Sequence, residues 1–169
     1  MANSYQPRIV IIGAGMAGIL SVIKLREAGY HDFTVYEKTD RIGGTWRENT
    51  YPGIACDVPA HLYTYTFEPN PDWSHVFAPG DEIQAYFEGV AKKYGVLPHV
   101  RFDSEVVKSV FEDGRWQLTL ADGRRDSADV VIAATGVLHY PNLPEIEGLG
   151  DFQGACFHSA RWDHSVPLE

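Results

Sequence analysis

The spacing of apolar residues changes twice near the start of the chain. Residues 9–12 are four consecutive β-branched residues, a run typical of a strand that is buried on both faces of a parallel sheet. Ile19 and Ile23 then lie near one face of a predicted helix, and Gly29 is suited to end it. A second apolar run, residues 33–36, predicts another strand. The pattern therefore predicts a strand, a tight turn, a helix and a strand, in that order.

An amphipathic pattern in the middle of the chain predicts a second helix, which starts near Asp81. Its apolar residues recur three or four positions apart, as on one face of a helix. They are Ile83, Phe87, Val90 and Tyr94. Before this helix, Tyr63, Tyr65 and Phe67 alternate with polar residues until two prolines interrupt the pattern. These aromatic side chains either pack in the core or line a ligand.

Three strands are predicted in the second half of the chain. Residues 106–111 and 115–120 have the composition of strands and are joined by a turn at Asp113 and Gly114. The apolar stretch 128–136 is expected to return as a buried strand. A segment rich in proline and glycine follows it.

The composition favours a globular domain that acts on a small molecule. The chain has 169 residues, 44% of them apolar and 22% charged, which is ordinary for one domain. Its net charge of -9, without a cluster of Lys and Arg, argues against a nucleic-acid or anionic-membrane partner. The histidines and cysteines show no metal-ligand spacing, so no metal site is expected.

The same sequence favours a cytoplasmic location. The opening MANSYQPR lacks a basic segment followed by a long apolar one, and the apolar run from Ile9 to Leu20 is short and broken by three glycines. Neither a signal peptide nor a membrane span is therefore expected. Cys56 and Cys156 form no C-x-x-C pair and are expected to be buried thiols of a reducing compartment.

Gly13, Gly15 and Gly18 form the sequence G-x-G-x-x-G between the first strand and the first helix. In dinucleotide-binding folds, the first glycine permits the turn, the second lets backbone approach a pyrophosphate, and the third lets helix and strand pack closely. The phosphates lie at the helix N-terminus, where N–H groups and the helix dipole stabilise anions. Glu37, at the end of the second strand, supplies a carboxylate for a ribose and disfavours a 2′-phosphate. The site is therefore expected to hold FAD or NAD rather than NADP.

Two further strings indicate a family. GGTW at residues 43–46 permits close approach of backbone to a flat ligand and offers a hydroxyl and an aromatic wall. FQGACFHSARWD at residues 152–163 fits the string F-x-G-x-x-x-H-x-x-x-W followed by Pro or Asp. From Arg8 to Asp163, the chain resembles the class B flavoprotein monooxygenases. Trp162 favours the type I Baeyer–Villiger monooxygenases among them, because related N- and S-oxygenating flavin monooxygenases end the string with Phe or Tyr.

The resemblance implies an α/β fold. Residues 1–150 would form a Rossmann-like FAD-binding domain with a central parallel sheet and a small antiparallel β-meander, and residues 151–169 a linker towards an NADPH domain that is absent from this chain. The implied enzyme uses FAD, NADPH and oxygen to convert a ketone or aldehyde into an ester or lactone, and this chain alone is expected to be inactive. The alternatives are an N- or S-oxygenating flavin monooxygenase and a truncated, non-catalytic FAD-binding module. An NAD-dependent dehydrogenase is the weakest alternative.

The resemblance also implies the residues of the site. The expected cofactor-binding residues are Gly13, Gly15, Met16, Ala17, Gly18, Glu37, Lys38, Gly44, Thr45, Trp46, Asp57, Tyr63, Val107, Thr135 and Gly136. Asp57 is also the expected catalytic residue, because an acid at this position in the family lies near the flavin and orients an arginine that stabilises developing negative charge. The alternative for Asp57 is a turn or cap before Pro59. His158 is expected to organise the linker rather than to transfer protons.

Overall fold

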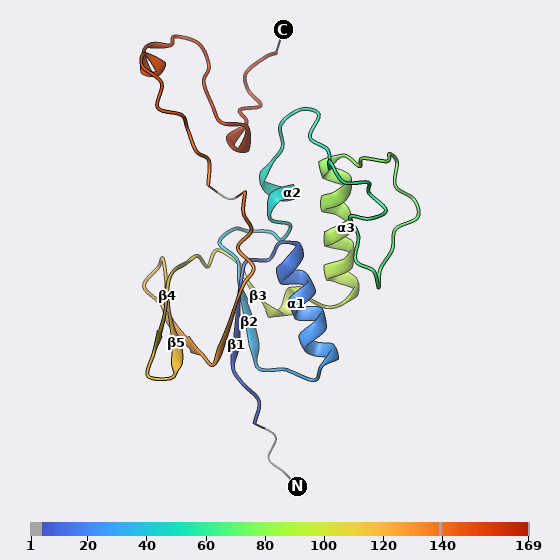
Figure 1. The fold of residues 1–169 in the computed structure, drawn as a ribbon, viewed down its shortest axis with the longest axis vertical. Helices are drawn as coiled ribbons and strands as arrows, with labels where there is room; N and C mark the ends of the chain where they lie inside the picture. The colour runs from blue at the N-terminus through green and yellow to red at the C-terminus, as the bar shows by residue number, and fades with distance from the viewer. Residues whose placement is uncertain (1–4, 139, 169) are drawn as a thin grey trace.

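The computed structural model describes residues 5–138 and 140–168, which form two sheets (Figure 1). The larger sheet is parallel, with the strand order β3-β2-β1-β7, and the smaller one is antiparallel, with the order β4-β5-β6. The strands are β1 (Ile9–Ile12), β2 (Phe33–Tyr36), β3 (Val100–Arg101), β4 (Val106–Glu112), β5 (Arg115–Leu120), β6 (Arg125–Ala128) and β7 (Val130–Ala133). The predicted α/β class, a Rossmann-like parallel sheet with a small β-meander, is confirmed.

The two longer helices cover one face of the parallel sheet, and the smaller sheet lies on its other side (Figure 1). The helices are α1 (Met16–Glu27), α2 (Thr45–Glu48) and α3 (Gly80–Lys93), with short 3-10 turns at Leu97–His99, Leu149–Asp151 and Ser159–Arg161. Helix α1 ends as predicted, because Gly29 follows its last turn with a φ of 83°. Helix α3 begins at Gly80, next to its predicted start near Asp81.

Strand β1 is buried between two cores. Ile9 and Ile11 belong to the core that the parallel sheet forms with α1 and α3, whereas Val10 packs with Leu118 and Ala128 of the smaller sheet. This is the period of two along a strand, with apolar residues on both faces. The run of β-branched residues in β1 therefore reflects burial from both sides, as predicted.

Polar contacts also join the two sheets. The Arg8 Nη2 and the Tyr36 hydroxyl both donate to Asp126 Oδ2, over 2.8 and 2.9 Å. Burial, followed by the hydrogen bond to Asp126, raises the pKa of Tyr36 above its usual range. The backbone N–H of Arg8 donates to Asp129 Oδ2 over 2.8 Å. Together these bonds hold the start of β1 and the end of β2 against the smaller sheet.

Two sequence-based expectations are wrong. Residues 128–136 were expected to form one buried strand, but Ala128 ends β6, β7 covers only Val130–Ala133 at an edge of the parallel sheet, and Val130 is 42% exposed. An apolar run predicts a strand but does not tell an edge position from a central one. Cys56 is buried, whereas Cys156 is exposed, so the expectation of two buried thiols holds for only one of them.

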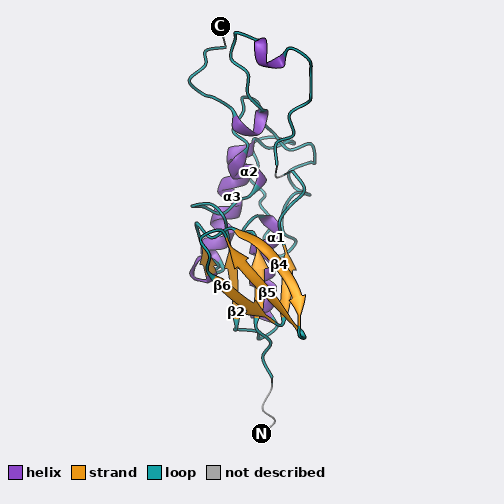
Figure 2. Cartoon of the chain, turned by 90° about the vertical axis from the view of Figure 1, so that its left-hand side faces the viewer, coloured by secondary structure: helices purple, strands orange, loops and turns teal. Residues whose placement is uncertain are grey.

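Beyond β7, the chain leaves the two sheets as an extended C-terminal arm, residues 137–138 and 140–168, which lies at the opposite end of the molecule from the N-terminus (Figures 1 and 2). The arm contains only short 3-10 turns. Its large exposed apolar side chains are Val137, Leu138, Tyr140, Leu143, Ile146, Phe152 and Leu168. Over residues 5–138 and 140–168, no helix has the length and apolar character needed to cross a membrane.

Candidate functional site

The glycine turn, residues 13–18, joins β1 to α1. Gly13 has a φ of 98°, and a β-carbon there would lie 2.5 Å from the Ala134 carbonyl oxygen. A β-carbon on Gly18 would lie 2.0 Å from the Gly13 carbonyl oxygen. At Gly15, by contrast, it would meet Gly44 Cα at 3.5 Å, an ordinary contact. Packing within the protein thus requires glycine at positions 13 and 18 but not at position 15.

The N-terminus of α1 is open. No side chain caps it, and its first turn contains no acidic residue. Met16 and Ala17, the first two residues of the helix, are both exposed. The N–H groups of a first turn have no partners within the helix, and the helix dipole is positive there, so this end is suited to an anion.

Glu37 is only 7% exposed, and its carboxylate lies against the glycine turn. Its Oε2 accepts a hydrogen bond from the Ala14 N–H over 2.8 Å. Its Oε1 accepts from the N–H and the hydroxyl of Thr39, over 3.1 and 2.7 Å. The carboxylate at the end of β2 is therefore held in place by the glycine turn on one side and by the following loop on the other.

A second glycine turn, Gly43 and Gly44, lies beside the first. The Gly43 N–H donates to the Ala14 carbonyl over 3.0 Å, and a β-carbon on Gly44 would lie 3.1 Å from Gly15 Cα. Gly43 has a φ of 121° and Gly44 a φ of 57°, a region that favours glycine. The two backbones therefore meet closely at Gly15, which is where a flat or phosphorylated ligand could approach both.

Sequence analysis missed Gln84, whose side chain holds this second turn in place. Its Nε2 donates to the Ile42 carbonyl over 2.9 Å and to Glu88 over 2.7 Å. A β-carbon on Gly43 would lie 1.8 Å from Gln84 Oε1, so the amide packs directly on the glycine backbone. Gln84 is on the polar side of α3, and no pattern in the sequence distinguishes it from a solvent-exposed residue.

Trp46 and Tyr63 come together after the second glycine turn. The Trp46 indole N–H donates to the Tyr63 hydroxyl over 3.1 Å, and the two rings meet edge to face at 5.6 Å between centroids. Thr45, the first residue of α2, comes directly before Trp46 in the sequence and is half-buried. The pair forms an aromatic corner next to the glycine turns.

Lys38 lies among charged residues of α2. Its Nζ is 3.3 Å from Glu48 Oε1, and the Arg47 Nη2 is 3.1 Å from the same oxygen. Arg47 Nε is buried without a hydrogen-bond partner. Two cations therefore share one carboxylate.

The remaining predicted residues are more exposed. Asp57 is exposed, next to the buried Cys56, and forms no hydrogen bond or ion pair with any residue in the described ranges. Thr135 and Gly136 follow β7, and Thr135 Cα lies 3.7 Å from the position of a β-carbon on Gly13, so this segment lies beside the first glycine turn. Val107 is exposed on β4, in the smaller sheet rather than on the elements that carry the glycine turns.

In the C-terminal arm, the residues of the F-x-G-x-x-x-H-x-x-x-W string contact one another. His158 Nδ1 accepts from the Ala160 N–H over 3.0 Å and so caps the 3-10 turn Ser159–Arg161. Trp162 meets Phe157 edge to face at 4.9 Å. His164 Nε2 lies 2.8 Å from Thr50 Oγ1, a contact between the arm and the loop after α2. The ring of His158 thus has a local structural contact within the arm.

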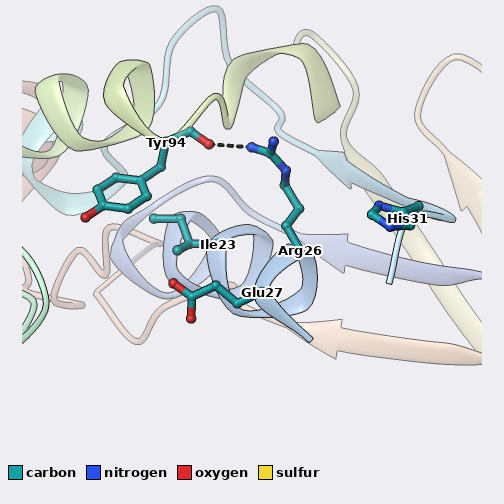
Figure 3. A pocket seen from close by; sticks show the side chains of 5 residues that line it. All are labelled: Ile23, Arg26, Glu27, His31 and Tyr94. Atoms are coloured by element: carbon teal, nitrogen blue, oxygen red, sulfur yellow. Dashed lines mark hydrogen bonds between the residues drawn. The ribbon is translucent and has the colours of Figure 1, made fainter. Parts of the chain in front are cut away.

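A surface hollow of about 360 Å³ lies at the C-terminal end of α1, the opposite end of this helix from the glycine turn (Figure 3). Its lining residues are Ile23, Arg26, Glu27, His31 and Tyr94. Arg26 donates to the Tyr94 carbonyl, and Glu27 pairs with Lys24 over 2.7 Å. Its charged groups are thus largely engaged within the protein. Among the described residues, no group of three or more His, Cys, Asp or Glu side chains is arranged to hold a metal ion.

Comparison with known proteins agrees with this geometry. Residues 11–79 match the model of the NAD(P)-binding Rossmann-like domain. The chain is 52% identical over 162 residues to an uncharacterised monooxygenase of Mycobacterium tuberculosis, covering 96% of this chain and 33% of that protein. It is 48% identical over 163 residues to a Baeyer–Villiger monooxygenase of Streptomyces coelicolor, covering 95% and 31%. A solved structure of the protein OTEMO with FAD and NADP matches with a TM-score of 0.84 at 32% identity, covering 96% and 32%.

These matches confirm the resemblance to flavoprotein monooxygenases of the Baeyer–Villiger type that the sequence strings indicated. The chain spans about a third of the length of the curated relatives it matches.

Proposed function

We propose that residues 1–150 are the FAD-binding domain of an NADPH-dependent Baeyer–Villiger monooxygenase and that residues 151–169 are a linker segment of that enzyme. One observation carries the proposal: the backbones of Gly15 and Gly44 face each other at the open N-terminus of α1, beside the buried Glu37. The relatives of this chain include a Baeyer–Villiger monooxygenase and a protein solved with FAD and NADP, which supports the choice of cofactor.

The residues of the site fit FAD. Gly15 carries no side chain although the protein leaves room for a β-carbon, which is expected where a pyrophosphate lies against the backbone. The uncapped N–H groups of Met16, Ala17 and Gly18 would face the phosphates. Glu37 would accept a hydrogen bond from the ribose on the remaining lone pair of Oε2. Lys38 adds a positive charge close to the same position.

The other predicted residues have proposed roles around the flavin. The aromatic corner of Trp46 and Tyr63 would form a wall of the flavin pocket and help to exclude water. The segment at Thr135 and Gly136 would line the same pocket, and Val107 would contact the cofactor from the smaller sheet. Asp57, exposed and unpaired within the described ranges, would orient an arginine from another part of the enzyme.

Bound FAD would supply the redox chemistry by which NADPH and oxygen are used to insert an oxygen atom next to a carbonyl. The substrate would be a ketone or an aldehyde, and the product an ester or a lactone. The chain's own residues would bind and orient the cofactor, keep water out and position the arginine that stabilises negative charge. The net charge of -9 favours small-molecule partners over nucleic acid or an anionic membrane, and we propose a cytoplasmic enzyme.

The proposal is tested by FAD binding to the chain and to its Gly15→Ala variant. Alanine at position 15 fits the protein, with an ordinary contact of 3.5 Å, so the fold should be kept while the pyrophosphate is displaced. We expect FAD to bind at least about tenfold more weakly, because its close approach to the backbone is blocked. The matched control is Gly89→Ala, on the exposed side of α3, where a β-carbon meets nothing within 4 Å. Full FAD retention by the Gly15→Ala chain would contradict the proposal.

A further inference from the structure

We propose that Tyr65 is a positioning residue of the cofactor site: its hydroxyl ties the loop between α2 and α3 to the first turn of α1 and so holds that turn in its binding conformation. The Tyr65 hydroxyl donates to the Met16 carbonyl over 2.5 Å. Met16 is the first residue of α1, one position after Gly15. The inference rests on the proposed FAD site and adds a residue that does not contact the cofactor.

Tyr65 itself is fixed firmly. Its N–H donates to the Tyr86 hydroxyl over 2.9 Å, and its carbonyl accepts from the Glu68 N–H over 3.0 Å. The Tyr86 hydroxyl in turn donates to the Glu68 carbonyl over 2.6 Å. The backbone of Tyr65 is therefore held on one side by α3 and on the other by a tight turn. Its hydrogen bond to Met16 thus connects the first turn of α1 to the core.

The ring of Tyr65 is equally constrained. It is 6% exposed, stacks on Phe67 with 5.2 Å between centroids, and meets Phe87 edge to face at 5.5 Å. A ring in this position has no freedom to swing its hydroxyl away from α1. The tie to Met16 is thus made by a preorganised donor, at little further cost in side-chain entropy.

The direction of this hydrogen bond is settled by chemistry. The Met16 carbonyl has no proton, so the hydroxyl of Tyr65 must donate. Burial, with smaller contributions from Tyr86 and Tyr63, raises the pKa of Tyr65 well above its usual range. The hydroxyl keeps its proton wherever the protein is folded, and the tie does not depend on pH in the neutral range.

The hydrogen bond from Tyr65 acts on the first turn of α1, where the proposed phosphates would bind. The open N–H groups of α1 are oriented by its first turn, and the first two residues of that turn, Met16 and Ala17, are both exposed. Gly18 and Ile19 anchor the buried side of the helix. The Tyr65 hydroxyl adds a hydrogen bond to the main chain of Met16, at the exposed start of the helix.

The experiment compares Tyr65→Phe with Tyr94→Phe. Both substitutions keep a ring that packs on Phe67 and remove one hydrogen-bonded hydroxyl, but the hydroxyl of Tyr94 donates to Glu68 Oε2 and not to α1. Amide hydrogen exchange is measured without cofactor, and FAD affinity is measured by flavin fluorescence. We expect residues 13–20 of Tyr65→Phe to exchange about 3- to 10-fold faster and FAD to bind about 3- to 10-fold more weakly, the size expected for one neutral hydrogen bond. Tyr94→Phe should change neither.

The outcomes separate the tie from the proposed function. Equal exchange of residues 13–20 in the two variants would overturn the tie, and faster exchange with unchanged FAD affinity would overturn its role in cofactor binding. If the unaltered chain binds no FAD, the proposed function fails, while hydrogen exchange still decides whether Tyr65 holds the turn. If Tyr65→Phe does not fold, the tie is measured in the unaltered chain by NMR: we expect the Tyr65 hydroxyl proton to be observed and protected from exchange with water, and a hydroxyl proton that exchanges as fast as that of an exposed tyrosine would overturn the tie.

Discussion

The glycine turns and the C-terminal arm both carry sequence strings of the same family, but the structure accounts for them in different ways. At the glycine turns, the residues are dictated by contacts between distant segments, such as Gly13 against Ala134 and Glu37 against Ala14. In the arm, the residues of the string contact mainly one another, as Phe157 and Trp162 do.

This difference shows that two strings of equal specificity can have different physical origins. At Gly13 and Gly18, substitution conflicts with the protein itself, whereas at Gly15 it conflicts only with the proposed ligand. In the arm, substitution conflicts with little that the described residues contain, since Phe152 is 61% exposed and the arm has only short 3-10 turns. Substitution of Gly13 or Gly18 should therefore lower the free energy of unfolding, whereas substitution in the arm should change it little.

The largest effect is expected for Gly18→Ala. Its β-carbon would lie 2.0 Å from the Gly13 carbonyl oxygen, so α1 must move away from β1. We expect the free energy of unfolding to fall by about 3 kcal/mol, as for overpacked cores. The measurement is urea unfolding, with Gly89→Ala as the control, which should be neutral or more stable by up to about 1 kcal/mol. Equal free energies of unfolding of Gly18→Ala and Gly89→Ala would show that packing does not require glycine at position 18.

A smaller effect is expected from a change of pH near 6.5, through His99 beside the parallel sheet. His99 packs on Phe33 with 4.5 Å between ring centroids, and burial, followed by Arg26, Arg101 and His31, lowers its pKa below the usual value of 6.5. The unfolded chain then binds this proton more readily than the folded one, so stability is present above pH 6.5 and is lost as the pH falls through 6.5 towards the folded-state pKa.

The check on His99 is the urea midpoint at two pH values, one above and one below 6.5. His99→Gln should show a smaller loss of stability on acidification than the unaltered chain. His164→Gln, in the arm, is the control and should keep the full loss. The same pH response in both variants would show that His99 is not the group responsible.

The smallest effect is expected for Trp162→Ala. The indole contacts Phe157 within the arm, so its loss should change the free energy of unfolding of the two sheets by less than about 0.5 kcal/mol. Circular dichroism is the suitable probe, because the substitution removes a fluorophore. A loss as large as that of Gly18→Ala would show that the arm is part of the folded core after all.

Much of the fold could be predicted because its elements are specified locally. Four β-branched residues in β1, the helical spacing of Ile19 and Ile23, and the glycine after α1 give each element its own signal. The edge position of β7 could not be predicted, because strand order depends on pairing between distant segments. The sequence predicts a strand at Val130–Ala133, but it does not predict that this strand pairs with β1 on one side and is at the edge of the sheet on the other.

In the candidate site, too, locally specified residues could be predicted and residues placed by distant segments could not. Gly13, Gly18 and Glu37 lie together as their spacing predicts, since turn, helix and strand end are consecutive. Tyr65 was not predicted as a support of the site, because the segment between α2 and α3 has almost no regular structure. Gln84 was not predicted because it lies on the polar side of α3, where the sequence does not distinguish it from a solvent-exposed residue. The roles of all the predicted cofactor-binding residues, Asp57 and Val107 among them, stay predictions.

The pairing of β1 with β7 has a consequence for how the polypeptide acquires its shape during synthesis. Arg8, at the start of β1, bonds to Asp129, which follows 121 residues later. The glycine turn near the N-terminus therefore cannot be completed when it leaves the ribosome, because Ala134, which packs against Gly13, has yet to be made. Contacts of such high sequence separation slow folding. We expect the nascent chain to remain accessible to chaperones until β7 emerges and the first strand obtains its last neighbour.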